Sequence, residues 1–215
     1  MANIVFYSLD SGFSSVDANS FATNSITPTT GRVVWLSVVS QGVSVSSVSG
    51  NGLTWTLAQT SVNTGLRITT YWGYAASPSA GAITVNLSGS STSYNWSVTE
   101  SDNTNTSSPV VQTATNTSAA APSLTVTLAS FSNSANATYG AFVHAAQESS
   151  TVGSGFTSLH TNGVGANPGG ILTEYRTDND TSVDASWAFS SISAGLAIEI
   201  KNSTPATSAF GVIFF

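Results

Sequence analysis

"RVVWLSVVS", residues 32–40, is the stretch that says most about the fold of this chain. Side chains along an extended strand alternate between two faces. Both faces of this strand are apolar: one carries Val34, Leu36 and Val38, and the other carries Val33, Trp35 and Val39. One face is expected to pack in a core. The other face is either covered within the chain or offered to a neighbouring molecule.

The same period of two recurs along most of the chain, and no long stretch has apolar residues at helical spacing. In "AITVNLS", residues 82–88, Ile83, Val85 and Leu87 share one face and polar residues share the other. The pattern predicts strands at residues 3–8, 32–41, 53–59, 66–75, 82–88, 94–100, 123–130, 136–147, 170–176, 183–190 and 194–201. Many short strands with turns between them predict an all-β fold, an antiparallel jelly-roll-like or Greek-key β-sandwich.

One polar segment divides the predicted strands into two groups. Residues 101–122, "SDNTNTSSPVVQTATNTSAAAP", are of low complexity and are predicted to form a long connection across the end of the sandwich. A linker between two domains is the alternative. Because either group of strands alone would have no second sheet to pack against, we predict a single domain over residues 1–201. Residues 202–215 then form a C-terminal extension.

A turn signal lies in "VSGNGLTWT", residues 48–56. Asn-Gly is the dipeptide most typical of a two-residue turn between paired antiparallel strands. We therefore predict a β-hairpin in which Asn51 and Gly52 fix the register. Leu53 and Trp55, which share a face, are predicted to anchor one sheet to the other.

The chain is unusually poor in charge. Charged residues are 7% of its 215 residues, against about a quarter in ordinary soluble proteins. Its formal net charge of −6 includes only four basic residues, Arg32, Arg67, Arg176 and Lys201. Four scattered cations cannot form the basic cluster that nucleic acid or an anionic membrane surface requires. Solubility must come from Ser, Thr, Asn and Gly, a composition found on extracellular and virion proteins.

The start of the chain bears on its location. "MANIVFYSLDSG", residues 1–12, lacks the basic region and the apolar run of a secretory signal peptide, and later hydrophobic runs are far shorter than a membrane span. A virion subunit, made in the host cytoplasm and released by lysis, fits both the start and the neutral surface. The alternative is an extracellular protein from which a signal was removed.

Acidic residues provide the patterns closest to enzymatic or metal chemistry. Glu100 and Glu174 are candidates for the facing carboxylate pair of a glycoside-acting enzyme, although a strand-end carboxylate bonded to backbone or to an arginine such as Arg176 is the commoner arrangement. "TDNDTSVD", residues 177–184, gathers Asp178, Asp180 and Asp184 as a candidate Ca²⁺ site. A polar turn explains the same run. No other cofactor and no catalytic residue is expected.

An aromatic side chain is the candidate for carbohydrate binding. In "LRITTYWGYAA", residues 66–76, Tyr71 lies on the face opposite Trp72 and Tyr74. Most aromatic residues of a sandwich fill the space between its sheets. Tyr71 is therefore the residue predicted to stack on a sugar ring.

The C-terminal extension, "NSTPATSAFGVIFF", ends in an apolar segment. This segment either folds back as a further strand or docks on another subunit by strand addition. Together with the N-terminal strand it supplies the residues that we predict to contact neighbouring subunits: Phe210, Val212, Ile213, Phe214, Phe215, Val5 and Tyr7.

Four strings carry a resemblance to a known class of module: "SGNGLTWT" (49–56), "LRITTYWGYAA" (66–76), "TEYRTDNDTSVDASW" (173–187) and "GLAIEIK" (195–201). Together they resemble the β-sandwich modules of tailed-phage structural proteins, such as head-decoration proteins and fibres, over most of residues 30–201. The resemblance implies a subunit without catalytic residues.

Composition and resemblance together lead us to expect a non-enzymatic virion structural protein, either a capsid decoration (cement) subunit or a fibre subunit. Such a protein would act through contacts with other copies of itself and with a capsid or tail protein. The alternative is a carbohydrate-binding module, lectin-like or receptor-binding, in which Tyr71 contacts a glycan.

Overall fold

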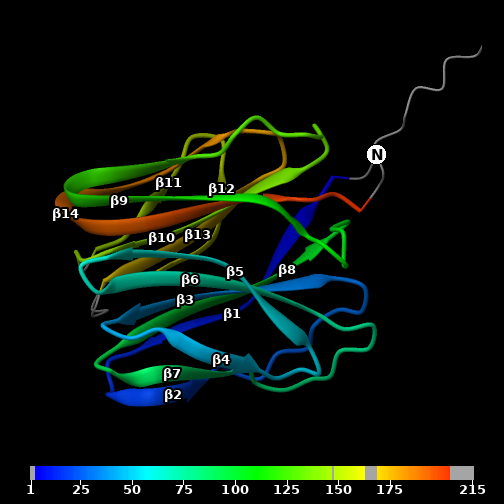
Figure 1. Cartoon of the computed structure of the whole chain (residues 1–215), viewed down its shortest axis with the longest axis horizontal. Coiled ribbons are helices and arrows are strands. Elements are labelled where there is room, and N and C mark those ends of the chain that lie inside the picture. The colour runs from blue at the N-terminus through cyan, green and yellow to red at the C-terminus, as the bar shows by residue number, and fades with distance from the viewer. Residues whose placement is uncertain (1–2, 147, 163–168, 204–215) are drawn as a thin grey trace, which may run out of the picture.

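Strands dominate the described part of the chain. The computed structural model describes residues 3–146, 148–162 and 169–203, and its strands form three antiparallel sheets (Figure 1). Over these residues no helix is long and apolar enough to cross a membrane. The antiparallel all-β fold predicted from the period of two is confirmed.

The three sheets are stacked in layers, and the strand with two apolar faces, residues 33–41, lies in the middle sheet (Figure 1). The middle sheet has the order β1 (Val5–Ser14), β8 (Tyr94–Asp102), β3 (Val33–Gln41), β6 (Leu66–Tyr74) and β5 (Thr54–Asn63). The small sheet has the order β2 (Ala18–Ala22), β7 (Thr84–Ser91) and β4 (Val45–Ser49). The six-stranded sheet has the order β11 (Thr151–Val152), β14 (Ser182–Ile200), β10 (Ala137–His144), β13 (Gly170–Arg176) and β12 (Thr157–Asn162), with β9 (Val110–Thr127) paired to β14.

Strand β3 is buried on both faces within the chain. Val34, Leu36 and Val38 face the small sheet, in a cluster that also contains Ile83 and Val85 of β7 and the segment before it. The opposite face belongs to the cluster between the middle and six-stranded sheets. Of the two alternatives left open by the sequence, intrachain cover is therefore the one observed. A third sheet is what makes it possible.

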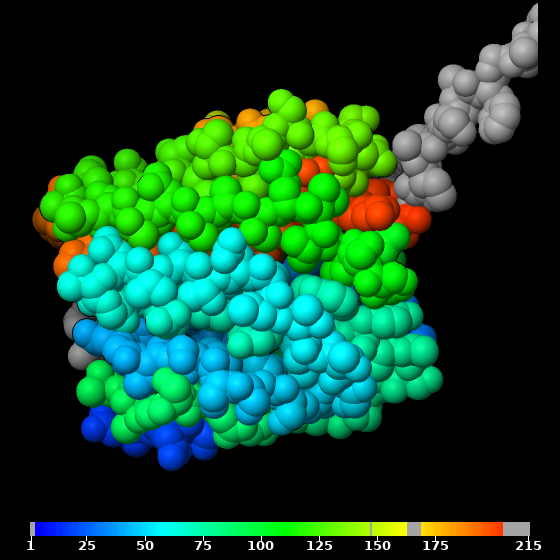
Figure 2. All heavy atoms as spheres, in the orientation of Figure 1, coloured from blue at the N-terminus to red at the C-terminus, as the bar shows by residue number. Residues whose placement is uncertain are grey.

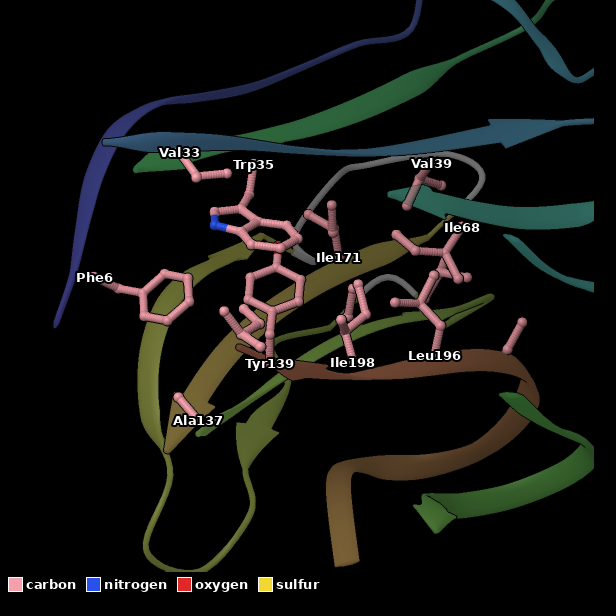
Figure 3. Close-up of a cluster of buried hydrophobic side chains, with 14 of the residues drawn as sticks. Phe6, Val33, Trp35, Val39, Ile68, Ala137, Tyr139, Ile171, Leu196 and Ile198 are labelled. Atoms are coloured by element: carbon pink, nitrogen blue, oxygen red, sulfur yellow. The ribbon is translucent and has the colours of Figure 1, made fainter. Parts of the chain in front are cut away.

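Trp35 lies at the centre of the cluster between the middle and six-stranded sheets (Figure 3). Its ring is fully buried and stacks on Tyr139 of β10, with ring centroids 5.9 Å apart. Trp35 Nε1 donates a hydrogen bond to Ser101 Oγ at 2.8 Å. The hydroxyl of Tyr139 reaches back across the core to Ser37 Oγ, also at 2.8 Å. Apolar packing and satisfied polar groups thus join these two sheets.

A further apolar cluster covers the other face of the six-stranded sheet. Val183 and Trp187, from the first half of β14, lie in the same cluster as Ala197 from its second half. Leu124 at the end of β9 joins them against Phe142 of β10. Because two distant parts of β14 pack in this cluster, β14 bends back over the face of the sheet, and β9, which is paired with it, bends with it. The two strands predicted at residues 183–190 and 194–201 are one long bent strand.

The prediction of a long connection at residues 101–122 is wrong for most of that segment. Residues from Val110 onward form β9, an 18-residue strand that pairs with β14 along most of its length. Over residues 110–122 small and polar side chains, mostly Thr, Ser and Ala, occupy both faces, so this part of the sequence shows no alternation of apolar and polar residues, whereas the end of β9 coincides with the strand predicted at residues 123–130. This part of β9 is held by backbone pairing with β14 and by side-chain hydrogen bonds from β5, such as Gln59 Nε2 to Thr113 Oγ1 at 2.8 Å, and neither shows as an apolar pattern in the sequence.

The Asn51-Gly52 turn has the expected backbone but a different role. Both residues have left-handed φ values, +57° and +67°, as this turn requires. However, β4 before the turn pairs with β7, and β5 after it pairs with β6. The predicted hairpin is therefore wrong, because the turn carries the chain from the small sheet to the middle sheet. Leu53 and Trp55 pack in the cluster between those sheets, as predicted.

Replacing Asn51 with alanine should lower the free energy of unfolding by about 2–3 kcal/mol, measured by urea denaturation. Alanine is strained at this φ, and the substitution removes the hydrogen bonds from Asn51 Nδ2 to Ser79 O at 3.0 Å and to Gly81 O at 2.9 Å. The control is Asn51→Gly, which loses the bonds but tolerates the backbone. It should recover about 1 kcal/mol, and equal losses in the two variants would contradict a contribution from strain.

Candidate functional site

Exposed large apolar side chains gather at the two edges of the middle sheet. Of the eight recorded for the described residues, Val5, Tyr7 and Phe13 lie on edge strand β1, with Val16 in the turn after it. Two more lie on the other edge strand, β5: Leu57, which is 52% exposed, and Val62. Only Val111 and Phe189 lie elsewhere. Exposed apolar groups collected in this way make the two edges candidate surfaces for contact with another molecule.

The β1 edge includes two of the predicted interface residues. Val5 pairs with Asp102 and Tyr7 pairs with Glu100 in the register between β1 and β8, so both side chains lie on one face. The guanidinium of Arg32 lies over the Tyr7 ring, 4.0 Å from its centroid. The other predicted interface residues, Phe210, Val212, Ile213, Phe214 and Phe215, lie outside the described residues.

Glu100 explains why Arg32 stays in place over Tyr7. Arg32 Nη1 donates to Glu100 Oε1 at 2.6 Å, and Thr29 donates to both carboxylate oxygens of Glu100. Burial acts to lower the pKa of Arg32, but the hydrogen bond and charge of Glu100 outweigh it and raise that pKa above its ordinary value. The ion pair therefore positions a rigid, charged side chain beside the exposed residues of β1.

The β5 edge presents its apolar residues beside a half-buried tyrosine. Leu57 pairs with Tyr71 of β6, and Val62 pairs with Arg67. In Figure 2 the light-blue and cyan atoms around β5 lie at the surface of the viewed face, below the green atoms of β9. Burial raises the pKa of Tyr71. Trp72 and Tyr74 pack toward the core on the opposite face, as the alternation indicates. Stacking of a sugar ring on Tyr71 stays a prediction.

Neither edge strand carries a basic residue of its own. β5 carries no charged residue, and the one on β1 is Asp10, whose carboxylate accepts hydrogen bonds from Trp96 Nε1 and from Asn24. Natural edge strands usually carry lysine or other charges that prevent pairing with another chain. Each edge does contain a bulge, between Ser8 and Asp10 or between Leu57 and Gln59. The straight segments on either side of each bulge remain suited to contact with another strand.

The two candidate catalytic carboxylates do not face each other. Glu100 lies on the face of β8 that carries Val98, toward the small sheet. Glu174 lies on the face of β13 that carries Leu172, toward the outer cluster of the six-stranded sheet. The cluster around Trp35 lies between them. A glycosidase needs its two carboxylates on either side of one bond, and this pair is not so placed.

The predicted calcium ligands are engaged with an arginine. Arg176 forms ion pairs with Asp178 and, at 2.6 Å, with Asp180. Asp180 Oδ1 also accepts a hydrogen bond from Ser182 N at 2.9 Å, as in a polar turn. Together with Asp184 they do not form a metal-binding group, and none of three or more His, Cys, Asp or Glu residues occurs in the described parts of the chain. The geometry corresponds to the polar-turn alternative.

Sequence analysis missed Phe13, Val16, Leu57 and Val62 as surface residues. Leu57 has the same alternation as Leu53 and Trp55, and those two are packed while Leu57 is exposed. An edge position depends on which strands pair, and one sequence does not show this. Compared with family models, curated proteins and solved structures, the chain gave no match.

Proposed function

We propose that this protein is a non-enzymatic structural subunit of a virion, a capsid decoration (cement) or fibre subunit that acts by packing against other copies of itself and against a capsid or tail protein. The observation that carries the proposal is the concentration of exposed apolar residues on β1 and β5, the two edges of the middle sheet. The neutral, serine- and threonine-rich surface elsewhere supports it.

The proposal gives the two edges a physical role. Burying one large apolar side chain, aliphatic or aromatic, at an interface is worth about 1.5–3 kcal/mol. Six such side chains at two edges, with backbone groups able to pair, are enough for a stable contact of ordinary size, about 1,600 Å². One edge on each side of the subunit allows a ring or an extended row of copies. The segment from Phe210 to Phe215 is proposed as an additional contact with a neighbouring subunit.

Charge placed on the β5 edge tests the proposal. The double substitution Leu57→Lys and Val62→Lys should convert the assembly to a smaller species, because lysine pairs poorly with an apolar partner and blocks strand addition. Sedimentation velocity at micromolar concentration measures the change, and circular dichroism checks that the variant is folded. The control is Phe189→Lys, which adds charge at a side chain that is 72% exposed and lies on β14. Unchanged assembly in the double variant would refute the role of this edge.

The virion location has its own test. Mass spectrometry of purified particles should detect the protein in a fixed ratio to the major capsid or tail protein. Recovery only in the soluble fraction of the lysate would contradict the location while leaving the edge contacts untouched.

A further inference from the structure

A cavity of about 460 Å³ opens where β9 begins and β14 ends. Three segments line it: the turn around Asn105 before β9, the loop around Asn133 before β10, and residues 201–203 after β14. Val110 and Val111 form its apolar part. This volume is within the range of about 300–1,000 Å³ found for small-molecule sites. The cavity lies apart from the exposed apolar residues of β1 and β5.

The protein itself uses the side-chain acceptors of two asparagines in this cavity, Asn105 and Asn133. Asn105 Oδ1 accepts from the backbone N–H groups of Ser107 and Ser108, and Asn133 Oδ1 accepts from the N–H of Ala135 at 3.0 Å. A backbone N–H is always a donor, so these bonds fix which end of each amide is oxygen. The NH₂ groups of both asparagines have no partner among the described residues. The cavity therefore offers donors to a ligand.

Lys201 adds a positive charge to the same lining. Of the other cations, Arg32 and Arg176 are paired with carboxylates. Lys201 has no ion pair with any residue that the structure describes, although it lies in a protein of net charge −6. One cavity thus has in its lining a lysine without an ion pair and two asparagines whose NH₂ groups have no partner among the described residues, a combination suited to a ligand rich in oxygen acceptors and carrying a negative charge.

We propose that this cavity binds a saccharide that carries a carboxylate. The Lys201 ammonium pairs with the carboxylate, the amides of Asn105 and Asn133 donate to hydroxyl or ring oxygens, and Val110 and Val111 contact the C–H face of a ring. The site differs from the one predicted at Tyr71, which lies on β6. The proposal does not depend on assembly through the sheet edges, so either can fail alone.

The test is calorimetric titration of the full chain with a tetrasaccharide of alternating glucuronate and N-acetylglucosamine. The neutral comparator is a tetrasaccharide of N-acetylglucosamine, which lacks the carboxylates. Lys201→Met removes the charge and keeps the stem of the side chain. Asn133→Asp keeps the acceptor for Ala135 N but replaces the NH₂ donor with negative charge. Arg67→Met, which removes a cation on β6 outside the cavity lining, is the matched control.

Each substitution in the cavity should weaken binding of the acidic tetrasaccharide by about tenfold or more, and Arg67→Met should leave it unchanged. The neutral tetrasaccharide should bind at least about tenfold more weakly than the acidic one. Absence of binding, or binding that Lys201→Met and Asn133→Asp do not alter, would overturn the site. Equal binding of the two tetrasaccharides would overturn the assignment of a carboxylate ligand.

Discussion

Replacing Trp35 with alanine is expected to lower the free energy of unfolding by about 3–5 kcal/mol, measured by urea denaturation at neutral pH. The ring is fully buried between two sheets and stacks on Tyr139, so its removal leaves a cavity that side chains fixed on rigid strands cannot fill. Ser101 Oγ loses the indole donor but keeps its hydrogen bond from Thr104 Oγ1 at 2.8 Å. The loss is therefore mainly one of packing.

The control for Trp35 is Phe189→Ala, which removes an aromatic ring of similar chemistry from a position that is 72% exposed. This variant should change the free energy of unfolding by no more than about 0.5 kcal/mol. If Trp35→Ala were as mild as Phe189→Ala, the cluster between the middle and six-stranded sheets would not hold the fold together as described.

Glu174 should make the protein less stable as the pH rises. Its side chain is buried beside Gly140, where any side chain would clash with Glu174 and Val183, and its Oε1 has no hydrogen-bond partner. Burial raises the pKa of Glu174 to about 8, the hydrogen bond from Gly153 N opposes this, and the charge of Asp184 adds to it. The folded protein therefore keeps this proton at neutral pH.

The sign of the effect follows from the raised pKa. An unfolded chain ionises this carboxyl near its model value of 4.5, whereas the folded chain holds the proton to about pH 8. Below about pH 4.5 both states are protonated and the contribution of Glu174 to stability is complete. That contribution is lost between about pH 4.5 and 8, by an amount on the order of 4–5 kcal/mol.

Urea denaturation of the wild type and of Glu174→Gln across pH 4–9 measures this loss. Glutamine cannot ionise, so the variant should gain stability relative to the wild type as the pH rises, by several kcal/mol in total. His144 and His160, whose pKa values are lowered by burial, are present in both proteins and cancel in the difference. A difference that stays constant from pH 4 to 9 would contradict protonation of Glu174 in the folded state.

Much of the fold could be predicted because apolar alternation reports directly on burial. The two apolar faces of residues 33–39 indicated a strand with a neighbour on each side, and the structure supplies both neighbours from the same chain. The first part of β9, residues 110–122, could not be predicted in this way. Its side chains are mostly small or polar on both faces, and it is held by backbone pairing with β14.

The candidate site was less predictable than the fold. Val5 and Tyr7 were predicted to contact neighbouring subunits because they lie on the N-terminal strand; both are exposed, and the contact itself stays a prediction. The turn at Asn51 and Gly52 was recognised from its residues, but the sheet joined by each flanking strand depends on partners far away in the sequence. For the same reason, the sequence alone does not show that Leu57 lies on an edge strand and is exposed. The sequence left Asp178 and Asp180 open as either candidate metal ligands or part of a polar turn, because it does not show that Arg176 pairs with both.

Sedimentation equilibrium of the unmodified protein tests the central claim, that its surface is built to contact other copies. The account predicts a defined species of two or more chains at micromolar concentration, with a mass that is an integer multiple of one chain. A single species with the mass of one chain, at every concentration up to about 100 micromolar, would contradict it, since a contact of the proposed size is expected to be stable in that range.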